Sequence, residues 1–343
     1  MRLALIGAGM HWQTYAPALN AFPDIQLVAV APASPDEATG AFDHAPGLTV
    51  ETRRYDDARQ LLDREKPDVV QVGCRPDYVT HWTRACLDRH IPVMAEKPLA
   101  MNLANLETLY RAAQRTRTPL VPMHTMRGEP TLAAISAAVH GGAIGEPSLG
   151  FSQKSYKWGA TRPDWYKTRR TFPGLMPFIG VHALDWLHWM LGDVFTEVSG
   201  SESSALRPEY PACATVAAYT FRMKNGGSVA VTLDYLRPEK ARTHGDERVR
   251  LAGPKGVIET VLIDNRVTLI DADGARGLPL TSQPDIFTAF VRALRERTPL
   301  PISIGDSFRI TEIVLKAQQA SDSGKAVSLA NSPYTHNAES KPA

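Results

Sequence analysis

Two patterns of hydrophobic and polar positions divide the chain near residue 123. Up to that point, short apolar runs alternate with segments of helical period. The apolar runs are Leu3–Ile6, Ile25–Val30, Val69–Gly73, Ile91–Ala95 and Leu120–Met123, and the helical segments are Trp12–Ala21, Pro35–Phe42, Asp57–Glu65, Tyr78–Arg89 and Leu103–Arg115. This alternation predicts an α/β domain over residues 1–123, a doubly wound and mostly parallel sheet with helices on both faces.

The second pattern is rich in strands and predicts an α+β domain over residues 124–330 with an open, mostly antiparallel sheet. The expected strands are 148–158, 214–223, 227–236, 248–252, 256–263 and 267–270, and the expected helices are 131–139, 182–191, 285–296 and 306–322. The NGG triplet at 225–227 indicates a hairpin. We expect the polar residues 331–343 to be a disordered tail.

Composition excludes several classes of protein. A net charge of +2 gives no general attraction to nucleic acid or membranes, and no apolar run is long enough to span a bilayer. The start, MRLALIGAG, indicates a first strand and not a signal peptide. Three isolated cysteines, Cys74, Cys86 and Cys213, argue against a zinc site or a disulfide framework. We therefore expect a cytoplasmic protein without a metal.

The first apolar run leads into GAGMHW at residues 7–12. Gly7 permits a tight turn, and Gly9 lets the backbone approach a pyrophosphate. Trp12 stands where a third glycine is usual, so the motif is incomplete. Its position after a strand and before a helix still favours a dinucleotide site over a turn without a ligand.

The end of the second apolar run does not distinguish NAD from NADP. An acidic residue there would bind the 2′-hydroxyl of the NAD ribose, but LVAV is followed by Ala31, Pro32, Ala33 and Ser34. No Arg or Lys is present to receive a 2′-phosphate either. Ser34 could contact either cofactor, although Ser34 and Glu37 also form a capping box for the next helix.

The stretch VMAEKPLAMN, residues 93–102, places Glu96 and Lys97 at the carboxyl end of a predicted parallel strand. Ligands of such sheets bind beyond the carboxyl ends of the strands. These two residues therefore favour a ligand contact over an ordinary turn. Pro98 could fix the loop through a cis peptide bond.

Three motifs in order, GAGMHW, AEKPLA and IGVHALDWLHWMLG at 179–192, resemble the glucose–fructose oxidoreductase, inositol dehydrogenase and MocA family. The resemblance implies a Rossmann domain followed by an open mixed sheet, an NAD or NADP cofactor, and a homodimer or homotetramer assembled through that sheet. It also implies oxidation or reduction of a hydroxyl or carbonyl of a small sugar or cyclitol. The expected cofactor-binding residues are Gly7, Gly9, Met10, His11, Trp12, Ser34, Cys74, Arg75, Glu96 and Lys97.

The resemblance implies that Lys97 and His182 are the catalytic acid–base groups. The family motif D-x-G-x-H is matched by Gly180 and His182, but Phe178 replaces the aspartate. The proton must then be handled by His182, Lys97 or both. Asp185 lies three residues after His182, so the two share a helix face. His182 and His188 diverge on that helix, which argues against a metal site.

Further candidates for substrate binding come from the second domain. Lys157 and Trp158 end its first strand, His244 lies in a loop between strands, and Arg127 matches a family position after the first domain. Together with Lys97, Phe178, His182 and Asp185 they complete the expected substrate site. The stretch 162–170 alternates cations with aromatic residues, which suits the binding of a sugar with an anionic substituent. The same stretch could equally be a solvated basic loop or a contact with another subunit.

Three functions remain open at this stage. The first is an NAD(P)-dependent dehydrogenase of a sugar, sugar acid or cyclitol. The second is a redox-neutral lyase or glycosidase that oxidises a sugar transiently, which the loss of the aspartate at Phe178 makes conceivable. The third is a sugar or nucleotide sensor without catalysis, and the presence of Lys97 and His182 argues against it.

Overall fold

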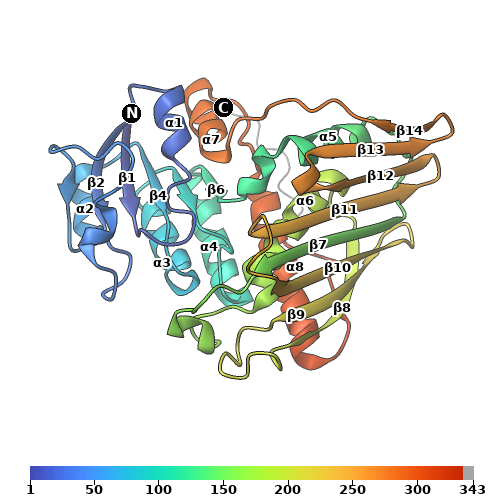
Figure 1. The fold of residues 1–343 in the computed structure, drawn as a ribbon. Helices are drawn as coiled ribbons and strands as arrows, with labels where there is room; N and C mark the ends of the chain where they lie inside the picture. Colours follow the sequence, from blue (N-terminus) through green and yellow to red (C-terminus); the bar gives the residue numbers. More distant parts are fainter. Residues whose placement is uncertain (335–343) are drawn as a thin grey trace. The chain divides into compact units, whose positions relative to one another are not determined.

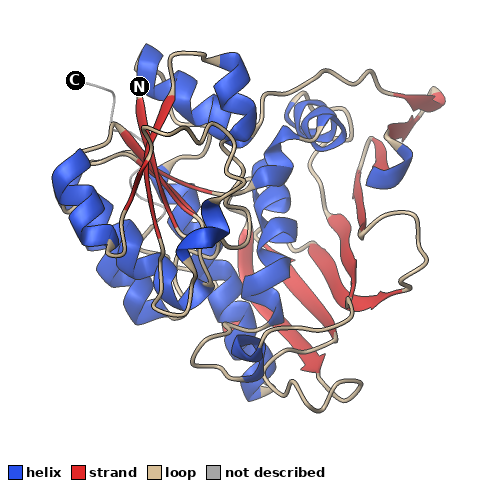
Figure 2. Cartoon of the chain, turned by 60° about the vertical axis from the view of Figure 1, so that its left-hand side comes forward, coloured by secondary structure: helices blue, strands red, loops and turns tan. Residues whose placement is uncertain are grey.

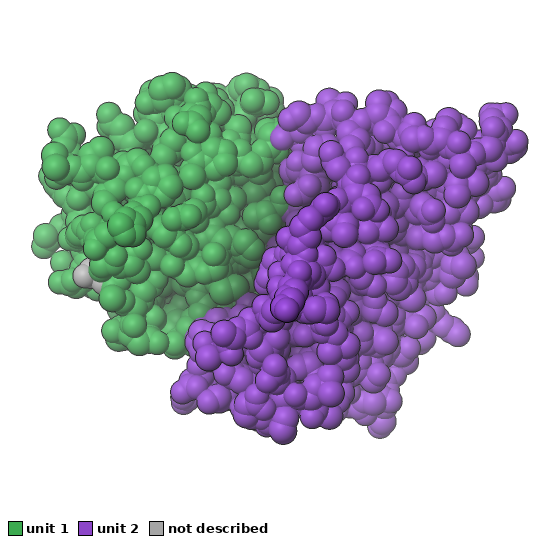
Figure 3. Space-filling model, in the orientation of Figure 1, with its two compact units in different colours: residues 1–125, 284–311, 336–343 green, residues 126–283, 312–335 purple. Residues whose placement is uncertain are grey.

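The computed structural model describes residues 1–334, which form two compact units. Unit 1 contains Met1–Thr125 and Pro284–Thr311, and unit 2 contains Met126–Gln283 and the described residues from Glu312 onward (Figure 3). None of the helices in this described part is both long and apolar enough to cross a membrane.

Unit 1 is built on a six-stranded parallel sheet of order β3-β2-β1-β4-β5-β6 (Figure 1). The strands are β1 (Arg2–Ile6), β2 (Gln26–Ala31), β3 (Arg53–Arg54), β4 (Val69–Val72), β5 (Val93–Ala95) and β6 (Leu120–Pro122). The predicted doubly wound fold is confirmed. The short β3 was missed because its two exposed residues carry no apolar pattern.

Three helices of unit 1 follow the prediction, namely α2 (Ala58–Glu65), α3 (Pro76–Leu87) and α4 (Leu103–Thr116). The predicted helix 12–21 is wrong in its first part, because α1 spans only Ala16–Ala21. Pro17 stands in its first turn, and proline clashes with the carbonyl four residues earlier if a helix continues through it. Residues 11–15 therefore form turns, as in the bond from the Thr14 N–H to the His11 carbonyl at 2.9 Å.

The predicted helix 35–42 is also wrong, since only a short 3₁₀ turn, Thr39–Phe42, forms there. The expected capping box does not form. The Glu37 carboxylate instead accepts hydrogen bonds from the backbone N–H groups of Ala33, at 2.7 Å, and of Ala8. A side chain bound outside its own segment cannot cap a helix.

The helix α7 (Ile286–Glu296) packs in unit 1, whereas the sequence prediction assigned all of 124–330 to the second domain. Its Asp285 N-cap accepts from the N–H groups of Phe287 and Thr288. Phe287 and Phe290 are fully buried in one hydrophobic cluster with β1 and β6 residues. Burial of such large side chains contributes about 1.5–3 kcal/mol each, which accounts for the return of the chain to unit 1.

Unit 2 is built on a nine-stranded sheet of order β14-β13-β12-β11-β7-β10-β9-β8-β15. Its strands are β7 (Leu149–Lys157), β8 (Phe195–Ser203), β9 (Val216–Met223), β10 (Ser228–Arg237), β11 (Gly245–Gly253), β12 (Gly256–Val261), β13 (Arg266–Asp271), β14 (Gly274–Gly277) and β15 (Val327–Ser328). Among the described strands of this sheet only β7 and β10 pair in parallel, so the predicted, mostly antiparallel sheet is confirmed. The NGG turn joins β9 to β10 as expected.

Helices cover one face of this sheet (Figure 2). They are α5 (Pro130–His140), α6 (Val181–Leu191) and the part of α8 (Ile304–Ser323) that follows Thr311. Residues 331–334, which were assigned to the tail, belong to unit 2, where Ser332 and Tyr334 are buried. The remainder of the predicted tail, 335–343, lies outside the described residues.

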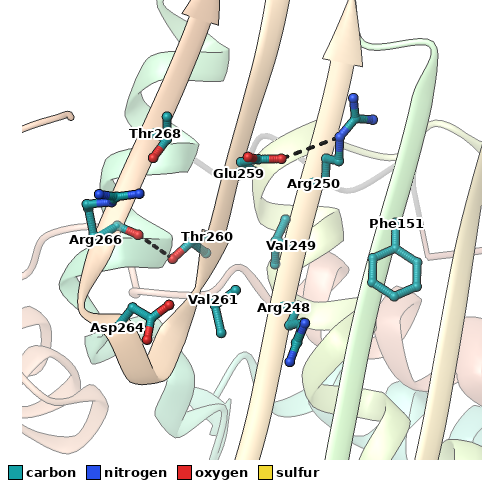
Figure 4. A pocket seen from close by; sticks show the side chains of 10 residues that line it. All are labelled: Phe151, Arg248, Val249, Arg250, Glu259, Thr260, Val261, Asp264, Arg266 and Thr268. Atoms are coloured by element: carbon teal, nitrogen blue, oxygen red, sulfur yellow. Dashed lines mark hydrogen bonds and ion pairs between the residues drawn. The ribbon is translucent and has the colours of Figure 1, made fainter. Parts of the chain in front are cut away.

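The opposite face of the sheet is open and carries a shallow pocket of about 300 Å³ over β11, β12 and β13 (Figure 4). Phe151 and Val261 give it apolar walls, and Arg250 pairs with Glu259 at 3.5 Å across it. Alternate residues of each strand point to this face, while Leu251, Ile258 and Leu269 are buried on the other. The strand period of two therefore separates a core face from an open face.

Candidate active site

The glycine loop after β1 is held in a conformation that glycine alone adopts easily. Gly7 has φ +84°, and a Cβ there would lie 2.4 Å from the carbonyl oxygen of Gly73. Met10 also lies in the left-handed region, with φ 57°. Such backbone is typical of loops that approach a ligand closely.

Gly9 is different, because nothing within unit 1 requires a glycine there. A Cβ on Gly9 would meet its nearest heavy atoms, in Gly73 and Cys74, at 3.7 Å, which is an ordinary contact. The open space at Gly9 instead fits the close approach of a pyrophosphate to the backbone. The loop therefore suits the dinucleotide that the sequence predicts.

The missing third glycine of the motif is explained by β4. A Cβ on Gly73 would lie 2.5 Å from the Cβ of Trp12. Gly73 thus supplies the space that a glycine at position 12 would give, and the loop packs closely on the sheet with a tryptophan in place. Gln71, buried on β4, donates to the Trp12 carbonyl and holds the same turn. Neither Gln71 nor Gly73 was predicted.

Glu96 and Lys97 lie beside this loop at the carboxyl end of β5. The Glu96 carboxylate accepts from the His11 N–H at 3.0 Å and pairs with His11 Nδ1 at 3.0 Å. Lys97 is 2% exposed, with its Nζ 4.0 Å from Glu96 Oε1, and the Lys97–Pro98 peptide bond is cis. The E-K-P loop and the glycine loop therefore form one polar cluster.

The charge of Glu96 is maintained in spite of its full burial. Desolvation alone would raise the pKa of this carboxyl, but the opposing charge and hydrogen bonds of His11 and the charge of Lys97 together hold the pKa below its usual value. The ionised carboxylate is thus part of the folded structure and fixes the position of the glycine loop.

A cavity of about 590 Å³ lies next to the glycine loop in unit 1, at the carboxyl end of β2. Ser34, Glu37, Asp77 and Trp82 contribute to its lining. Cys74 lies against Gly7 and Gly9, and burial raises the pKa of its thiol. Arg75 is held by Asp36 and Asp77 at 2.7 and 2.8 Å. The predicted residues Ser34, Cys74 and Arg75 are therefore gathered around one end of the sheet.

Glu37 places an acidic side chain near the carboxyl end of β2, where the sequence alone indicated none. It lies six positions beyond the end of β2, yet its carboxylate bonds to Ala33 and to Ala8 of the glycine loop. No local pattern in the sequence signals this placement, because the intervening turn has no regular period. A carboxylate at this place is where a Rossmann domain binds the ribose of NAD.

In unit 2, α6 carries His182, which is 3% exposed. Two contacts fix this helix. The indole N–H of Trp186 donates to Ser152 Oγ of β7 at 2.9 Å, and Asp185 pairs with Arg127 at 2.8 Å. The predicted substrate residues Arg127 and Asp185 therefore bind each other, and their pair holds the helix that presents His182.

Phe178 belongs to a five-residue π-helical turn, Met176–Gly180, that continues directly into α6. It packs against the rings of Trp165, Tyr166 and Phe172, with ring centroids 4.9–5.8 Å apart. Phe178, which occupies the aspartate position of the family motif, is thus part of an aromatic cluster. A π-helical turn is frequent at functional sites.

The other predicted substrate residues lie at the end of β7. Lys157 donates to the Ala241 carbonyl at 2.5 Å, and Trp158 is buried against Tyr235. His244 is exposed, with its ring 4.7 Å from the ring of Tyr156. Partial burial and the nearby charge of Arg162 lower the pKa of His244. Tyr156 and Tyr235 were not predicted, and Arg162 was expected only as one of the four cations of the stretch 162–170.

Comparison with known proteins decides the family. The sequence model described as "Oxidoreductase family, NAD-binding Rossmann fold" matches residues 1–124, and that of the GFO/IDH/MocA C-terminal domain matches residues 132–259. The chain belongs to the Gfo/Idh/MocA family of oxidoreductases. The predicted resemblance, the dehydrogenase class and the nicotinamide dinucleotide cofactor are confirmed.

Similar proteins cover most of the chain. A D-apiose dehydrogenase of Paraburkholderia graminis is 24% identical over 80% of this chain and 70% of its own length. A myo-inositol 2-dehydrogenase of Thermotoga maritima is 24% identical over 81% of this chain and 80% of its own length. A proposed oxidoreductase from Thermotoga maritima has a solved structure with a TM-score of 0.89 and 31% identity, covering 96% of this chain and all of that one.

Proposed function

We propose that this Gfo/Idh/MocA oxidoreductase transfers a hydride between NAD and a carbon that bears a hydroxyl or carbonyl in a small sugar or cyclitol. The named sugar and cyclitol dehydrogenases among its relatives support this substrate class. The observation that carries the proposal is Lys97, a nearly fully buried lysine joined through Glu96 to the glycine loop.

In this proposal, the cofactor supplies the hydride acceptor when bound, and the chain supplies position and proton transfer. Gly7, Gly9, Met10 and His11 would hold the dinucleotide. Lys97 takes the proton from the reacting hydroxyl, with His182 as the second acid–base group. Both side chains are nearly fully buried, so the proton transfer would take place away from bulk water.

We propose further that Glu37 selects NAD over NADP. Its carboxylate is fixed by two backbone N–H groups, so it offers a rigid acceptor to the ribose hydroxyls. The cavity beside it also contains Asp56, Asp57 and Asp77 against one cation, Arg59. A 2′-phosphate would enter a negatively charged site, and like charges disfavour binding.

The Glu37 proposal is tested by calorimetry with NAD and NADP. We expect Glu37→Gln to weaken NAD binding about tenfold, as the loss of a charge-assisted hydrogen bond predicts, and to bring the two affinities together. Glu51→Gln, at an exposed acid of unit 1 that does not line this cavity, is the control and should change the ratio little. A wild-type protein that prefers NADP would contradict the proposal.

The main proposal is tested by mixing the protein and NAD with a panel of sugars, cyclitols and sugar acids. The absorbance of reduced nicotinamide and the mass of the product are recorded together. A product two hydrogen atoms lighter, formed with one equivalent of NADH, is the expected result. A product formed without net NADH would instead favour the redox-neutral lyase, and no product with any of the compounds would favour a sensor.

We also propose a homodimer or homotetramer assembled through the open face of the unit 2 sheet. That face carries Phe151 and Val261 between ion pairs, and Ile270 on it is 39% exposed. Light scattering should give a mass at least twice the 37.6 kDa of one chain. Ile270→Glu should reduce that mass if the face is the interface. A monomeric mass for both the wild type and the variant would contradict this assembly.

A further inference from the structure

One cation in unit 2 is enclosed by aromatic rings. The guanidinium carbon of Arg162 lies 4.2 Å from the ring centre of Tyr235, 4.8 Å from that of Trp158 and 4.9 Å from that of Tyr166. Tyr210 fixes the backbone of Arg162 by accepting from its N–H and donating to its carbonyl. The loop therefore holds this side chain in one place.

The charge of Arg162 is not balanced by an acid. Among residues 1–334, no carboxylate lies within ion-pair distance of it, and its two hydrogen bonds go to the Tyr166 hydroxyl at 3.2 Å and the Lys157 carbonyl at 3.4 Å. Its Nε is buried without a hydrogen-bond partner in that range, as is the hydroxyl of Tyr235. A largely desolvated cation of this kind is costly unless an anion joins it.

The other cations of the same loop do not share this property. Lys167 pairs with Asp164 at 2.7 Å, and Arg169 pairs with Asp322 at 2.6 Å. Arg170 is exposed. The basic loop of the sequence is therefore mostly a solvated surface, and Arg162 is the member placed to meet a ligand.

The aromatic cluster connects Arg162 to the catalytic helix. Tyr166, which accepts a hydrogen bond from Arg162, packs on Phe178 with ring centroids 5.4 Å apart. Phe178 precedes His182 by four residues on continuous helix. This aromatic cluster therefore carries one cation, Arg162, and has an apolar ring at position 178.

A cavity of about 330 Å³ adjoins these rings. Trp158 and Tyr235 line it, together with Arg207, Arg237 and Glu239. Its volume lies at the lower end of the range for small-molecule sites. Arg237 is partly engaged by Asp246 at 3.5 Å, and Arg207 lies over the ring of Trp158 at 5.3 Å. Cations outnumber the acid in this lining.

From this geometry we infer that the substrate is a sugar acid whose carboxylate binds Arg162, with the Tyr235 hydroxyl as a second donor. The inference rests on the proposed function and narrows its substrate class. A single unbalanced guanidinium matches one negative charge and the planar geometry of a carboxylate. A phosphate monoester carries nearly twice that charge at neutral pH and would require a second free cation.

The test compares matched pairs, each a neutral sugar and its uronate or aldonate, together with a sugar phosphate, on the NAD-bound enzyme. Calorimetry measures binding, and NADH formation measures turnover. We expect sugar acids to bind about 10- to 100-fold more tightly than their neutral partners, the range for a hydrogen bond to a charged group. Arg162→Gln should remove this advantage by raising KM more than it lowers kcat.

Two further variants keep the result interpretable. Tyr235→Phe preserves the ring and removes only the hydroxyl, so a smaller loss confined to the acids is expected even if Arg162→Gln folds poorly. Arg170→Gln, exposed in the same loop, should leave both affinities unchanged. The NAD affinity should not change in any of the three.

The outcomes separate the two proposals. Equal binding of acids and neutral sugars, a preference for the sugar phosphate, or an Arg162→Gln variant with unchanged selectivity would overturn the carboxylate site and leave the dehydrogenase intact. Binding of acids that depends on Arg162 without any NADH formation would support the carboxylate site and overturn the dehydrogenase.

Discussion

Residues 7, 9 and 73 are glycines for three different physical reasons. Gly7 is required by its own φ of +84° and by the carbonyl of Gly73, whereas Gly73 makes room for the Cβ of Trp12. A Cβ on Gly9 would make only ordinary contacts, so the fold does not require a glycine there and the free space is available to a ligand. The sequence motif alone shows the first and third residue of the loop and cannot distinguish these reasons.

This distinction gives a prediction for a matched pair of variants. Gly7→Ala should lower the free energy of unfolding by at least about 1–2 kcal/mol, the cost of left-handed backbone for a residue with a Cβ. Gly9→Ala should leave stability nearly unchanged and weaken NAD binding by crowding the pyrophosphate. Denaturant unfolding and calorimetry on both variants check this, and unchanged NAD affinity in Gly9→Ala would remove the assignment of the loop.

Glu96 gives a prediction with a defined pH dependence. Glu96→Gln should lower the free energy of unfolding at pH 7 by about 1–3 kcal/mol, because the hydrogen bonds from His11 lose a charged acceptor. The folded-state pKa of Glu96 lies below the ordinary 4.5, so its stabilisation is present above that pH and is lost as the pH falls through the folded value.

The difference between wild type and Glu96→Gln should therefore shrink when denaturant unfolding is repeated below pH 4.5. A difference that stays constant down to the acid limit would show that the charge of Glu96 is not the stabilising feature.

At the scale of elements, the sequence predicted most of the sheets and helices because their apolar periods are regular. The prediction of helices 12–21 and 35–42 failed because single residues determine the structure there. Pro17 shortens α1, and the Glu37 carboxylate binds backbone N–H groups of Ala8 and Ala33. The prediction also missed β8, which has a long half-exposed pattern, and the placement of α7, since packing between distant segments leaves no local signal.

The turn that precedes α6 leads to a prediction at this scale. Phe178→Asp would restore the family residue but would place a carboxylate among Trp165, Tyr166 and Phe172. Loss of a buried aromatic side chain costs about 3–5 kcal/mol, and we expect a destabilisation of that order. Phe178→Leu, which keeps an apolar side chain, should cost less.

The activity of the same variants distinguishes two cases. In a specialised site the substrate requires an apolar residue at position 178, whereas in the other case the chain has merely lost the family aspartate. We expect kcat/KM of Phe178→Asp on the native substrate to stay level or fall, because the new carboxylate would disrupt the cluster that holds Arg162. An increase in kcat/KM at neutral pH would contradict the specialised site and favour the ordinary two-group mechanism.

At the scale of the whole molecule, the candidate residues are divided between the two units. Unit 1 contains the glycine loop, Glu37 and Lys97, and unit 2 contains Arg127, Phe178, His182 and the Arg162 cluster. The family motifs in the sequence predicted Lys97 and His182 as the acid–base pair. The roles proposed for Glu37 and Arg162 could not be predicted in that way, since they rest on contacts formed only in the folded units.

The measurement that tests the account most directly is the turnover of Lys97→Met on the best substrate of the panel, with NAD affinity measured in parallel. Loss of a general acid–base group should lower kcat by about 10²–10⁴-fold and leave NAD binding close to wild type. The exposed Lys325→Met variant is the control and should retain full activity. If Lys97→Met keeps more than about a tenth of wild-type kcat, Lys97 does not transfer the proton and the proposed mechanism is contradicted.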